Sequence, residues 1–578
     1  MRRLVALLGL LLAVLGLGAL PQIASSHPER PTVFPEKVGV AVPPQNDVPT
    51  FRSSGPHLVV CKPGAAAVLR KEYKGAQLRH RLRVLKRCKF SDIQPAVDAA
   101  KSGDRIIIMP GRYEELESRK VPFGGYHDGS ACGNDYAITE GFSNTAPPPV
   151  GPRSNDPAVK PNRNFHRKCP NSHNLIMIEG DTRPDTDDQK PLVPTCTQKC
   201  DLQIEGYGRD PEDVVIVGDR KKTDVIRADR AWGLYLRNFT VEQAAFNDID
   251  LVEVNGFRIS RVVARYAQNY GILSFTSVNG LYDHDEAYGN GDSGLYPGST
   301  EKGCDVTPNA YATCNSLVGD AHQQQGCERY SIEIRESDSH DNVLGYSGTA
   351  GNSTWVHDNK FHDNSSGLTT DSFAQGHPGM PQECVKWEHN EINSNNFNPF
   401  TAERQDYCRT TPFPIRKREI VCPQFQTSVG TGILIGGGNR NLIRDNHIYD
   451  NWKRGIFLIG VPASLRNDTN PDHQRDTSNG NRFLNNTMGA RPDGTVAPNG
   501  LDFHWDGQGV GNCWSGNDYK SGAKRRSDPA NLPDCPGRTN YAVTNPSALI
   551  TSASCTAWDP YKMPRPPGCD WFDTPPKP

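Results

Sequence analysis

Short apolar segments that begin at a glycine recur along the middle of the chain. GILSFTS begins at Gly271 and GLYPGST at Gly294, 23 residues later, while GYSGTAG and GLTTDSF, from Gly345 and Gly367, are 22 apart. The same pattern fits four more segments: PFTAER from Pro399, GILIGGG from Gly432, GIFLIGV from Gly455 and GLDFHWD from Gly500. Alternation of apolar and polar residues predicts β-strands, and a period of 22–24 residues is typical of stacked repeats.

A second pattern lies between these segments. It is present in four places: DNKFHDNSSG from Asp358, HNEINSNNF from His389, DNHIYDNWKRG from Asp445 and GNRFLNNT from Gly480. Asn and Asp tolerate the left-handed turn conformation and bond their own backbone, so we expect tight turns there. We expect Phe361, Ile392, Ile448 and Phe483 to point inward and stack on counterparts in coils about 4.8 Å apart.

The stretch CKFSDIQPAVDAAKSGDRIIIMPGRYEE, from Cys88 to Glu115, predicts the start of the repeat. Apolar residues from Ile93 to Ala100 recur at helical spacing, and the run from Arg105 to Met109 reads as a strand. This order resembles the N-terminal cap and first coil of the pectin-lyase-like superfamily. The resemblance covers about 88–515 and implies an all-β fold, a right-handed parallel β-helix with a short capping helix and loop insertions on one face. The superfamily contains lyases, hydrolases, esterases, epimerases and non-catalytic adhesins, so the fold alone does not select an activity.

The N-terminal segment suggests export. Arg2 and Arg3 precede the apolar segment from Leu4 to Leu20, and small residues follow before His27. This predicts a signal peptide over 1–26, with an uncleaved anchor as the alternative because 17 apolar residues approach the lower limit for a membrane span. We divide the rest into a Pro-rich leader and N-terminal cap region (27–87), the β-helix (88–519) and a loop-rich, disulfide-stapled tail (520–578).

The 16 cysteines, an even number, predict disulfides in a protein that is secreted or held in the cell envelope. Cys196 and Cys200 have a spacing that metal sites also use, but no matching pair accompanies them, and we expect a disulfide-bonded loop. The net charge is −2, from 64 basic and 66 acidic residues, which favours neither a nucleic acid nor an anionic membrane as partner. We expect a monomer whose partner is an extracellular polysaccharide.

Long insertions follow the glycine-started strand in several coils, at 299–330, 374–385, 405–430 and 463–480. Insertions at one phase of a stacked repeat lie on one face, so they predict the walls of a groove. Alternation predicts its floor: Leu368 and Thr370 point inward, while Thr369 and Asp371 point outward. In this register Thr349, Asp371 and Glu403 form one row with Arg404 beside it, and Asp502 and His504 point outward in the last coil.

Asp371 and Glu403 are the first candidates for catalysis. Neighbouring coils would bring their Cβ atoms to about 5 Å, and two close carboxyl groups divide into an acid and a base or nucleophile, as glycoside hydrolysis requires. The alternative is that Asp371 shapes a turn and Glu403 pairs with Arg404. A lyase or epimerase would instead use a base with a cation, for which Arg404 and three ring-bearing residues are available: His377, Tyr407 and His504.

We assign catalysis to four residues: Asp371, Glu403, Arg404 and His504. We assign substrate binding to five: Thr349, Thr369, His377, Tyr407 and Asp502. Hydrolases of the superfamily usually carry N-T-D-G and G-H-G motifs and its epimerases D-P-H-D, whereas this chain has only TTDS, GHPG and the partial matches YDHD and DSHD.

The acidic run from Tyr282 to Asp292 has weak D-x-D spacing for Ca²⁺; we expect no resident metal or cofactor. His340 and His357 are interpreted as solvated turn residues. The leading function is binding and cleavage of an extracellular polysaccharide in the groove, by a glycoside hydrolase or polysaccharide lyase type of chemistry. The alternative is a non-catalytic surface or adhesion protein that binds glycan there.

Overall fold

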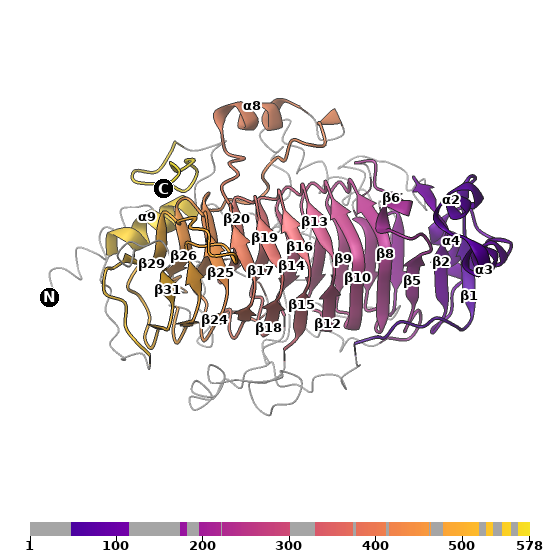
Figure 1. The fold of residues 1–578 in the computed structure, drawn as a ribbon, viewed down its shortest axis with the longest axis horizontal. Helices are drawn as coiled ribbons and strands as arrows, with labels where there is room; N and C mark the ends of the chain where they lie inside the picture. The colour runs from indigo at the N-terminus through magenta and orange to yellow at the C-terminus, as the bar shows by residue number, and fades with distance from the viewer. Residues whose placement is uncertain are drawn as a thin grey trace, which may run out of the picture.

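Short parallel strands stack in two sheets along one axis in the computed structural model of the protein (Figure 1). The structure describes residues 48–114, 174–181, 196–220, 222, 224–300, 330–373, 377, 379–411, 415–461, 463, 478–519, 527–535, 546–556 and 564–578. Sheet A has 21 strands and sheet B has 11. Parallel crossovers between strands of one sheet are right-handed in almost all proteins. The fold is the predicted right-handed parallel β-helix.

Sheet B receives one strand from each coil. Its members are β4 (Ile176–Glu179), β7 (Asp224–Asp229), β9 (Asn247–Val252), β11 (Ile272–Phe275), β14 (Ser293–Gly298), β17 (Leu344–Thr349), β20 (Ser366–Asp371), β23 (Thr431–Gly436), β26 (Arg454–Ile459), β29 (Leu501–Trp505) and β32 (Ser527–Asp528). Ile272 pairs with Ile249 on one side and with Leu295 on the other, each 23 residues away. The predicted period is therefore the length of one coil. Seven of the eight segments predicted as equivalent strands are in this sheet; the exception is PFTAER, which begins at Pro399 and not at a glycine.

Sheet A receives two strand positions from most coils. Its members are β1 (His57–Val60), β2 (Arg105–Ile108), β3 (Gly111–Tyr113), β5 (Gln203–Gly206), β6 (Val214–Val217), β8 (Leu234–Glu242), β10 (Asn255–Arg265), β12 (Val278–Asp283), β13 (Glu286–Tyr288), β15 (Ile332–Arg335), β16 (Asp338–His340), β18 (Thr354–His357), β19 (Lys360–His362), β21 (Lys386–Glu388), β22 (Glu391–Asn393), β24 (Leu442–Arg444), β25 (His447–Tyr449), β27 (Arg482–Leu484), β28 (Thr487–Met488), β30 (Cys513–Ser515) and β31 (Asp518–Tyr519). The long strand β10 occupies both positions, because it pairs with β12 and β13 in turn.

The interior is a continuous stack of apolar side chains. Phe361 pairs with Ile392 and Ile392 with Ile448, as predicted, and all three are fully buried. Phe483 is also in the core, but it lies in the first strand position of its coil and pairs with Ile443.

Asparagine ladders run through the interior at the turns. Asn359 N–H donates to Asn390 Oδ1 at 3.1 Å, and Asn390 N–H donates to Asn446 Oδ1 at 3.0 Å. Parallel ladders run through Asn364, Asn395 and Asn451, and through Asn441, Asn481 and Asn512. The residue before Asn359, Asp358, takes the positive φ of 57°. The D-N pairs thus divide their roles: the first residue makes the turn, and the second turns inward and bonds the next coil.

Glycines at the start of the sheet B strands allow the coils to approach closely. A Cβ atom on Gly345 would lie 2.6 Å from the carbonyl oxygen of Gly367, and one on Gly367 would lie 2.6 Å from that of Gly432. A side chain does not fit at that separation.

The N-terminal end is capped by helices α2 (Ala65–Glu72), α3 (Gly75–Leu85) and α4 (Ile93–Ala99). Helix α4 is the predicted capping helix, and its apolar side packs on the first coils. The sequence did not predict α2 and α3, which follow β1. Near the C-terminus, helix α9 (Pro546–Thr556) and residues 564–578 lie at the other end of the solenoid (Figure 1).

The cysteines that the structure describes are all in disulfides. The bonds with both partners described are Cys61–Cys88, Cys196–Cys200, Cys408–Cys422, Cys513–Cys535 and Cys555–Cys569. The predicted Cys196–Cys200 loop is confirmed. The predicted signal peptide and most of the insertions 299–330 and 463–480 lie outside the described residues. In the described part of the chain, no helix has the length and apolarity to cross a bilayer.

Candidate functional site

The outer face of sheet B carries the predicted candidates in β20. Leu368 is in the core, and Thr370 pairs with the core residue Ile435. Thr369 pairs with Leu434, which belongs to a separate apolar cluster outside the coil. The predicted alternation is therefore confirmed, and Asp371 lies on the outer face. Both outward residues are nevertheless only 1% exposed, so this face is covered and is no open groove floor.

Glu403 does not lie beside Asp371, and the predicted pairing of these two carboxyl groups is wrong. Asp371 pairs with Thr349 on one side, as predicted, but with Gly436 of β23 on the other. Glu403 is in the first turn of helix α8 (Ala402–Thr410) and is exposed. The local sequence explains this, because Thr401 caps the helix by accepting a hydrogen bond from the N–H of Arg404, and Ala, Glu, Arg and Gln favour a helix.

Helix α8 also carries two other predicted site residues away from the sheet. Arg404 donates to the carbonyl of Val421 at 3.2 Å, and Tyr407 Oη accepts from the N–H of Lys417 at 2.8 Å. Both contacts hold the insertion 397–430 together. This insertion lies between β22 of sheet A and β23 of sheet B, so it precedes a sheet B strand. The prediction that it follows a sheet B strand is wrong. Figure 1 shows α8 standing above the stacked coils.

Asp371 is held by two hydrogen bonds. Its Oδ2 accepts from the hydroxyl of Thr349 at 3.0 Å, and its Oδ1 accepts from the N–H of Phe373 at 3.0 Å. Burial raises the pKa of the Asp371 carboxyl to about 6, although both hydrogen bonds oppose this shift. The bond to Phe373 also gives Asp371 the turn role that was the alternative prediction.

A second acid, Asp292, lies immediately before β14 and was not among the candidates. It is buried, accepts from the hydroxyl of Ser293 at 2.7 Å and also bonds Tyr270. Burial raises the pKa of Asp292 to about 7, and the charge of Asp371 contributes to the increase. Both carboxyl groups can therefore be protonated near neutral pH, but they lie at opposite ends of the sheet B strands: Asp292 directly precedes β14, whereas Asp371 ends β20. The sequence signal for Asp292 is its place at the end of the acidic run 282–292, whose D-x-D spacing suggests Ca²⁺ and not an acid on the face of sheet B.

His377 joins this group through a chain of contacts. Its Nδ1 lies 3.2 Å from the hydroxyl of Ser299, whose N–H donates to the carbonyl of Thr349. The ring of His377 also meets the ring of Phe275 edge-on, with centroids 5.6 Å apart. Phe275 belongs to an apolar cluster on the same face with Tyr270, Leu273 and Tyr296. We call the set Asp292, Ser299, Thr349, Asp371 and His377 the sheet B site.

Thr369 and His504 lie in one row of the outer face but in different coils. The row runs from Thr369 through Leu434 and Phe457 to His504, so three coil steps, roughly 14 Å, separate the two ends. His504 stacks on Phe457 and lies 2.8 Å from Nε of Arg454. Burial and the charge of Arg454 lower the pKa of His504 to about 3. His504 is therefore a neutral ring outside the sheet B site.

The C-terminal residues 564–578 cover this end of the face. Trp571 packs against Phe457 and Phe572 against Phe400 of the insertion. Asp502 does not point outward as predicted, because its Oδ1 accepts from Nδ2 of Asn499, the last residue of an asparagine ladder. The predicted outward position of Asp502 is wrong, since the strand turns inward where it meets the ladder.

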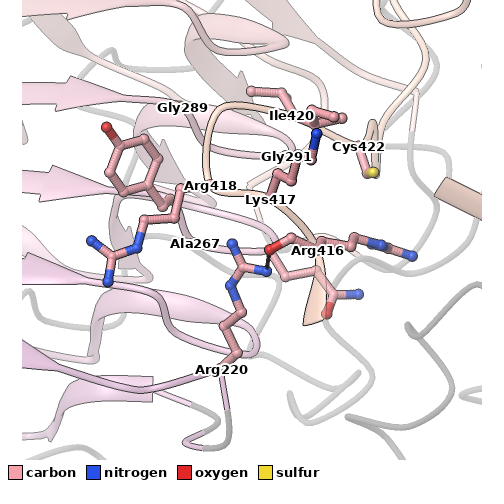
Figure 2. A pocket seen from close by; sticks show the side chains of 12 residues that line it. Arg220, Ala267, Gly289, Gly291, Arg416, Lys417, Arg418, Ile420 and Cys422 are labelled. Atoms are coloured by element: carbon pink, nitrogen blue, oxygen red, sulfur yellow. Dashed lines mark hydrogen bonds between the residues drawn. The ribbon is translucent and has the colours of Figure 1, made fainter. Parts of the chain in front are cut away.

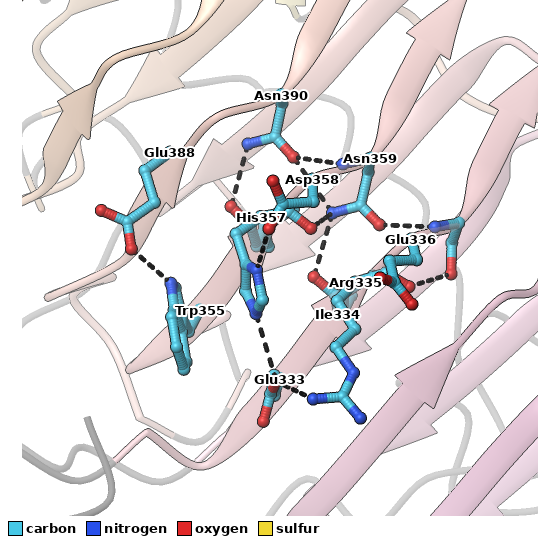
Figure 3. Close-up of polar contacts among 12 residues, drawn as sticks. Glu333, Ile334, Arg335, Glu336, Trp355, His357, Asp358, Asn359, Glu388 and Asn390 are labelled. Carbon is cyan, nitrogen blue, oxygen red and sulfur yellow. Dashed lines mark hydrogen bonds and ion pairs between the residues drawn. The ribbon is translucent and has the colours of Figure 1, made fainter. Parts of the chain in front are cut away.

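The outer face of sheet A carries a separate network of histidines and carboxylates (Figure 3). His357 bonds Glu333 at 3.1 Å and Asp358 at 2.7 Å, and its ring stacks on Trp355. His340 bonds Asp341 and Glu286 in the same way. Both histidines end strands and are half-buried, so their interpretation as solvated turn residues is wrong.

The acidic run considered for Ca²⁺ does not form one site. Asp283 faces outward and pairs with Arg335 at 3.2 Å, while Asp285 faces inward and accepts from the N–H of Val262 at 2.8 Å. Donor atoms of Asp283, His284 and Glu336 do lie within 4.8 Å of one another. A cation there would compete with Arg258 and Arg335 for the same carboxylate, so the residues present do not fit a metal.

Comparison with known proteins gives matches of structure only. No family model and no curated protein matches the chain. The A-module of mannuronan C-5 epimerase AlgE4 of Azotobacter vinelandii aligns with 78% of this chain and 96% of its own, at 12% identity and a TM-score of 0.39. The AlgE6 A-module aligns with 74% of this chain and 95% of its own, at 13% identity and a TM-score of 0.32. Pectate lyase Pel9A aligns with 86% of this chain and 91% of its own, at 12% identity and a TM-score of 0.34. The strand pairing of the chain itself shows what it is, a right-handed parallel β-helix protein of the kind that the resemblance to the pectin-lyase-like superfamily implied.

Proposed function

We propose that this is a secreted β-helix protein that binds and cleaves an extracellular polysaccharide at the sheet B site. The observation that carries the proposal is that two buried acids with raised pKa, Asp292 and Asp371 (the acid pair), lie on the face that also carries the aromatic rings of Tyr270 and Tyr296. Ligand sites combine apolar and aromatic surface with a few polar groups of shifted pKa.

The acid pair suits hydrolysis. With a pKa of about 7 for Asp292 and about 6 for Asp371, Asp292 is the better proton donor and Asp371 the better proton acceptor between pH 6 and 7. A lyase or epimerase would need a cation near the base, and Arg404, the predicted cation, is bound to the insertion instead. Hydrolysis is therefore the first form of the proposal and the lyase reaction the second.

One observation favours a non-catalytic alternative. Asp371 and Tyr296 are each 1% exposed, so a sugar reaches them only if the residues packed over this face move. A surface protein that binds glycan beside this face would need no such movement.

A panel of uronate-containing and neutral polysaccharides tests these functions. New reducing ends without the ultraviolet absorbance of an unsaturated uronate mean a hydrolase, and the same ends with that absorbance mean a lyase. Binding without products means an adhesin. If no polymer of the panel is bound or cleaved, the proposed function is wrong.

A further inference from the structure

A hollow lies between the insertion and the turns of three coils (Figure 2). The turns are those that follow β6, β10 and β13, and residues 416–418 and 420–422 of the insertion complete the lining. The hollow is partly open to solvent, and its cavity volume is about 20 Å³, room for one small group and not for a whole sugar.

The lining of the hollow is strongly cationic. Four of its side chains carry positive charge: Arg220, Arg416, Lys417 and Arg418. Arg220 and Arg416 are buried, at 7% and 5% exposed, whereas Lys417 and Arg418 are open to solvent. No acidic side chain is among the residues that line the hollow in the described part of the chain.

The buried arginines are fixed in place by backbone carbonyls. Arg220 donates to the carbonyl of Arg416, and Arg416 donates to the carbonyls of Thr411 at 2.8 Å and Cys408 at 2.6 Å. The disulfide between Cys408 and Cys422 holds this part of the insertion. These carbonyls position the guanidinium groups but bring no negative charge.

One acid that approaches this region from outside the lining is already shared. Glu242 accepts from Arg112 at 3.0 Å and from Arg265 at 2.9 Å, and Arg418 lies 3.7 Å away. Its negative charge is therefore divided among several cations.

Burial first, and then the charge of Arg418, disfavour the charged form of Arg220 and lower its pKa. The charges of Asp219 and Glu419 oppose this shift but do not reverse it. An anion in the hollow would therefore relieve repulsion among cations that the fold holds together.

We propose that the hollow binds an oxyanion carried by a sugar, the carboxylate of a uronate or a sulfate ester, which makes the ligand an acidic polysaccharide. The inference rests on the proposed function for its choice of a polysaccharide. Gly291 of the lining directly precedes Asp292, so the hollow adjoins the start of β14, where the sheet B site begins. A chain anchored there by its charge would pass next to Asp292 of the acid pair.

Charge reversal at Lys417 tests the proposal, because this exposed side chain can change without removing buried contacts. The probes are polygalacturonate with its fully methyl-esterified form, and sulfated dextran with unmodified dextran. We expect the wild type to bind a charged polymer more tightly than its neutral partner at low salt. Lys417→Glu should weaken binding of that charged polymer about tenfold and leave the neutral polymers unaffected. The matched control is Lys71→Glu on α2, whose side chain is 83% exposed at the far end of the solenoid.

Arg220→Gln is the second variant, with thermal unfolding to verify its fold, and it should also weaken binding of the charged polymer alone. Preference for polygalacturonate identifies a uronate site and preference for sulfated dextran a sulfate site; both support the proposal. The proposed oxyanion site is wrong if Lys417→Glu binds the charged polymer as tightly as the wild type, or if Lys71→Glu loses as much affinity. The proposed function would still hold in that case if turnover depends on the acid pair. If no polymer of any kind binds or is cleaved, the proposed function fails and this ligand fails with it.

Discussion

At the scale of single residues, the sheet B site differs from the predicted one in the partner of Asp371. Alternation within GLTTDSF was enough to place Asp371 outward, because side-chain direction depends on the strand alone. Its partner depended on which strand came next, and β23 begins 60 residues after β20 ends. Thr349 was predicted correctly because only 22 residues separate it from Asp371, so no insertion intervenes.

The acid pair leads to a prediction about activity. Asp371→Asn and Asp292→Asn should each lower the turnover of a polysaccharide that the wild type cleaves by roughly 10²–10⁴-fold, the usual loss when acid–base help is removed. In Asp371→Asn, the amide oxygen can accept from the N–H of Phe373 and the amide nitrogen can donate to the hydroxyl of Thr349, so the melting temperature should change little. Reducing-end assays with thermal unfolding measure both quantities.

Glu403→Gln is the control, because Glu403 is exposed on α8 and the structure separates it from Asp371. Its rate should equal that of the wild type. A large fall in melting temperature for Asp371→Asn, with an unchanged rate per folded molecule, would show that Asp371 serves the turn and not catalysis.

At the scale of elements, the repeat was predictable and the insertions were not. Strand positions followed from glycines and alternation, both of which are local signals. PFTAER was misread because six residues fit either a short strand or a helix start, and only Thr401 as cap and the helix-favouring residues after it distinguish them. The asparagine ladders were predicted as turns alone, because the inward bond of Asn390 is made with another coil, far away in sequence.

Ladder asparagines should contribute to stability in a way that surface asparagines do not. Asn390→Ala removes an acceptor from Asn359 N–H and leaves a buried donor unpaired, which costs about 1–3 kcal/mol. Asn393→Ala, in the same coil but on the outer side of β22, should change the free energy of unfolding by less than about 0.5 kcal/mol. Denaturant unfolding of the two variants measures the difference, and equal effects would contradict the structural role of the ladder.

The stacked histidines on sheet A lead to a prediction about pH. His340 lies between Tyr288 and His362, with ring centroids 5.0 Å from each. Burial opposes the charged form of His340, but hydrogen bonds to Asp341 and Glu286 outweigh it and raise its pKa to about 9. Hydrogen bonds to Asp338 and Asp363 raise the pKa of His362 to about 10.

Because these pKa values are raised on folding, the stabilisation is complete below about pH 6.5 and is lost as pH rises through 9 to 10. Melting temperatures of the wild type should fall over that range, and those of the double variant His340→Gln and His362→Gln should fall less. Parallel curves for the two proteins would show that the histidines are not charged in the folded state.

At the scale of the whole molecule, the fold is a solenoid closed at both ends and bonded by disulfides. The described cysteines are all paired, which agrees with the prediction made from the 16 cysteines. The protein, denatured without reduction, should therefore show few or no free thiols on titration, and the exported form should begin at His27 if the signal peptide is cleaved as predicted. Many reactive thiols would contradict export to an oxidising compartment.

The row of glycines at the start of the sheet B strands has a consequence for how the protein tolerates change. A single added methyl group at Gly345 or Gly367 would meet the main chain of the neighbouring coil, which cannot move without separating two layers of the stack. The harm would not come from a lost contact, because these residues have no side chain to lose. The positions least able to vary are therefore ones that a survey of buried apolar area would pass over, and random mutagenesis should find them as readily as the aromatic core.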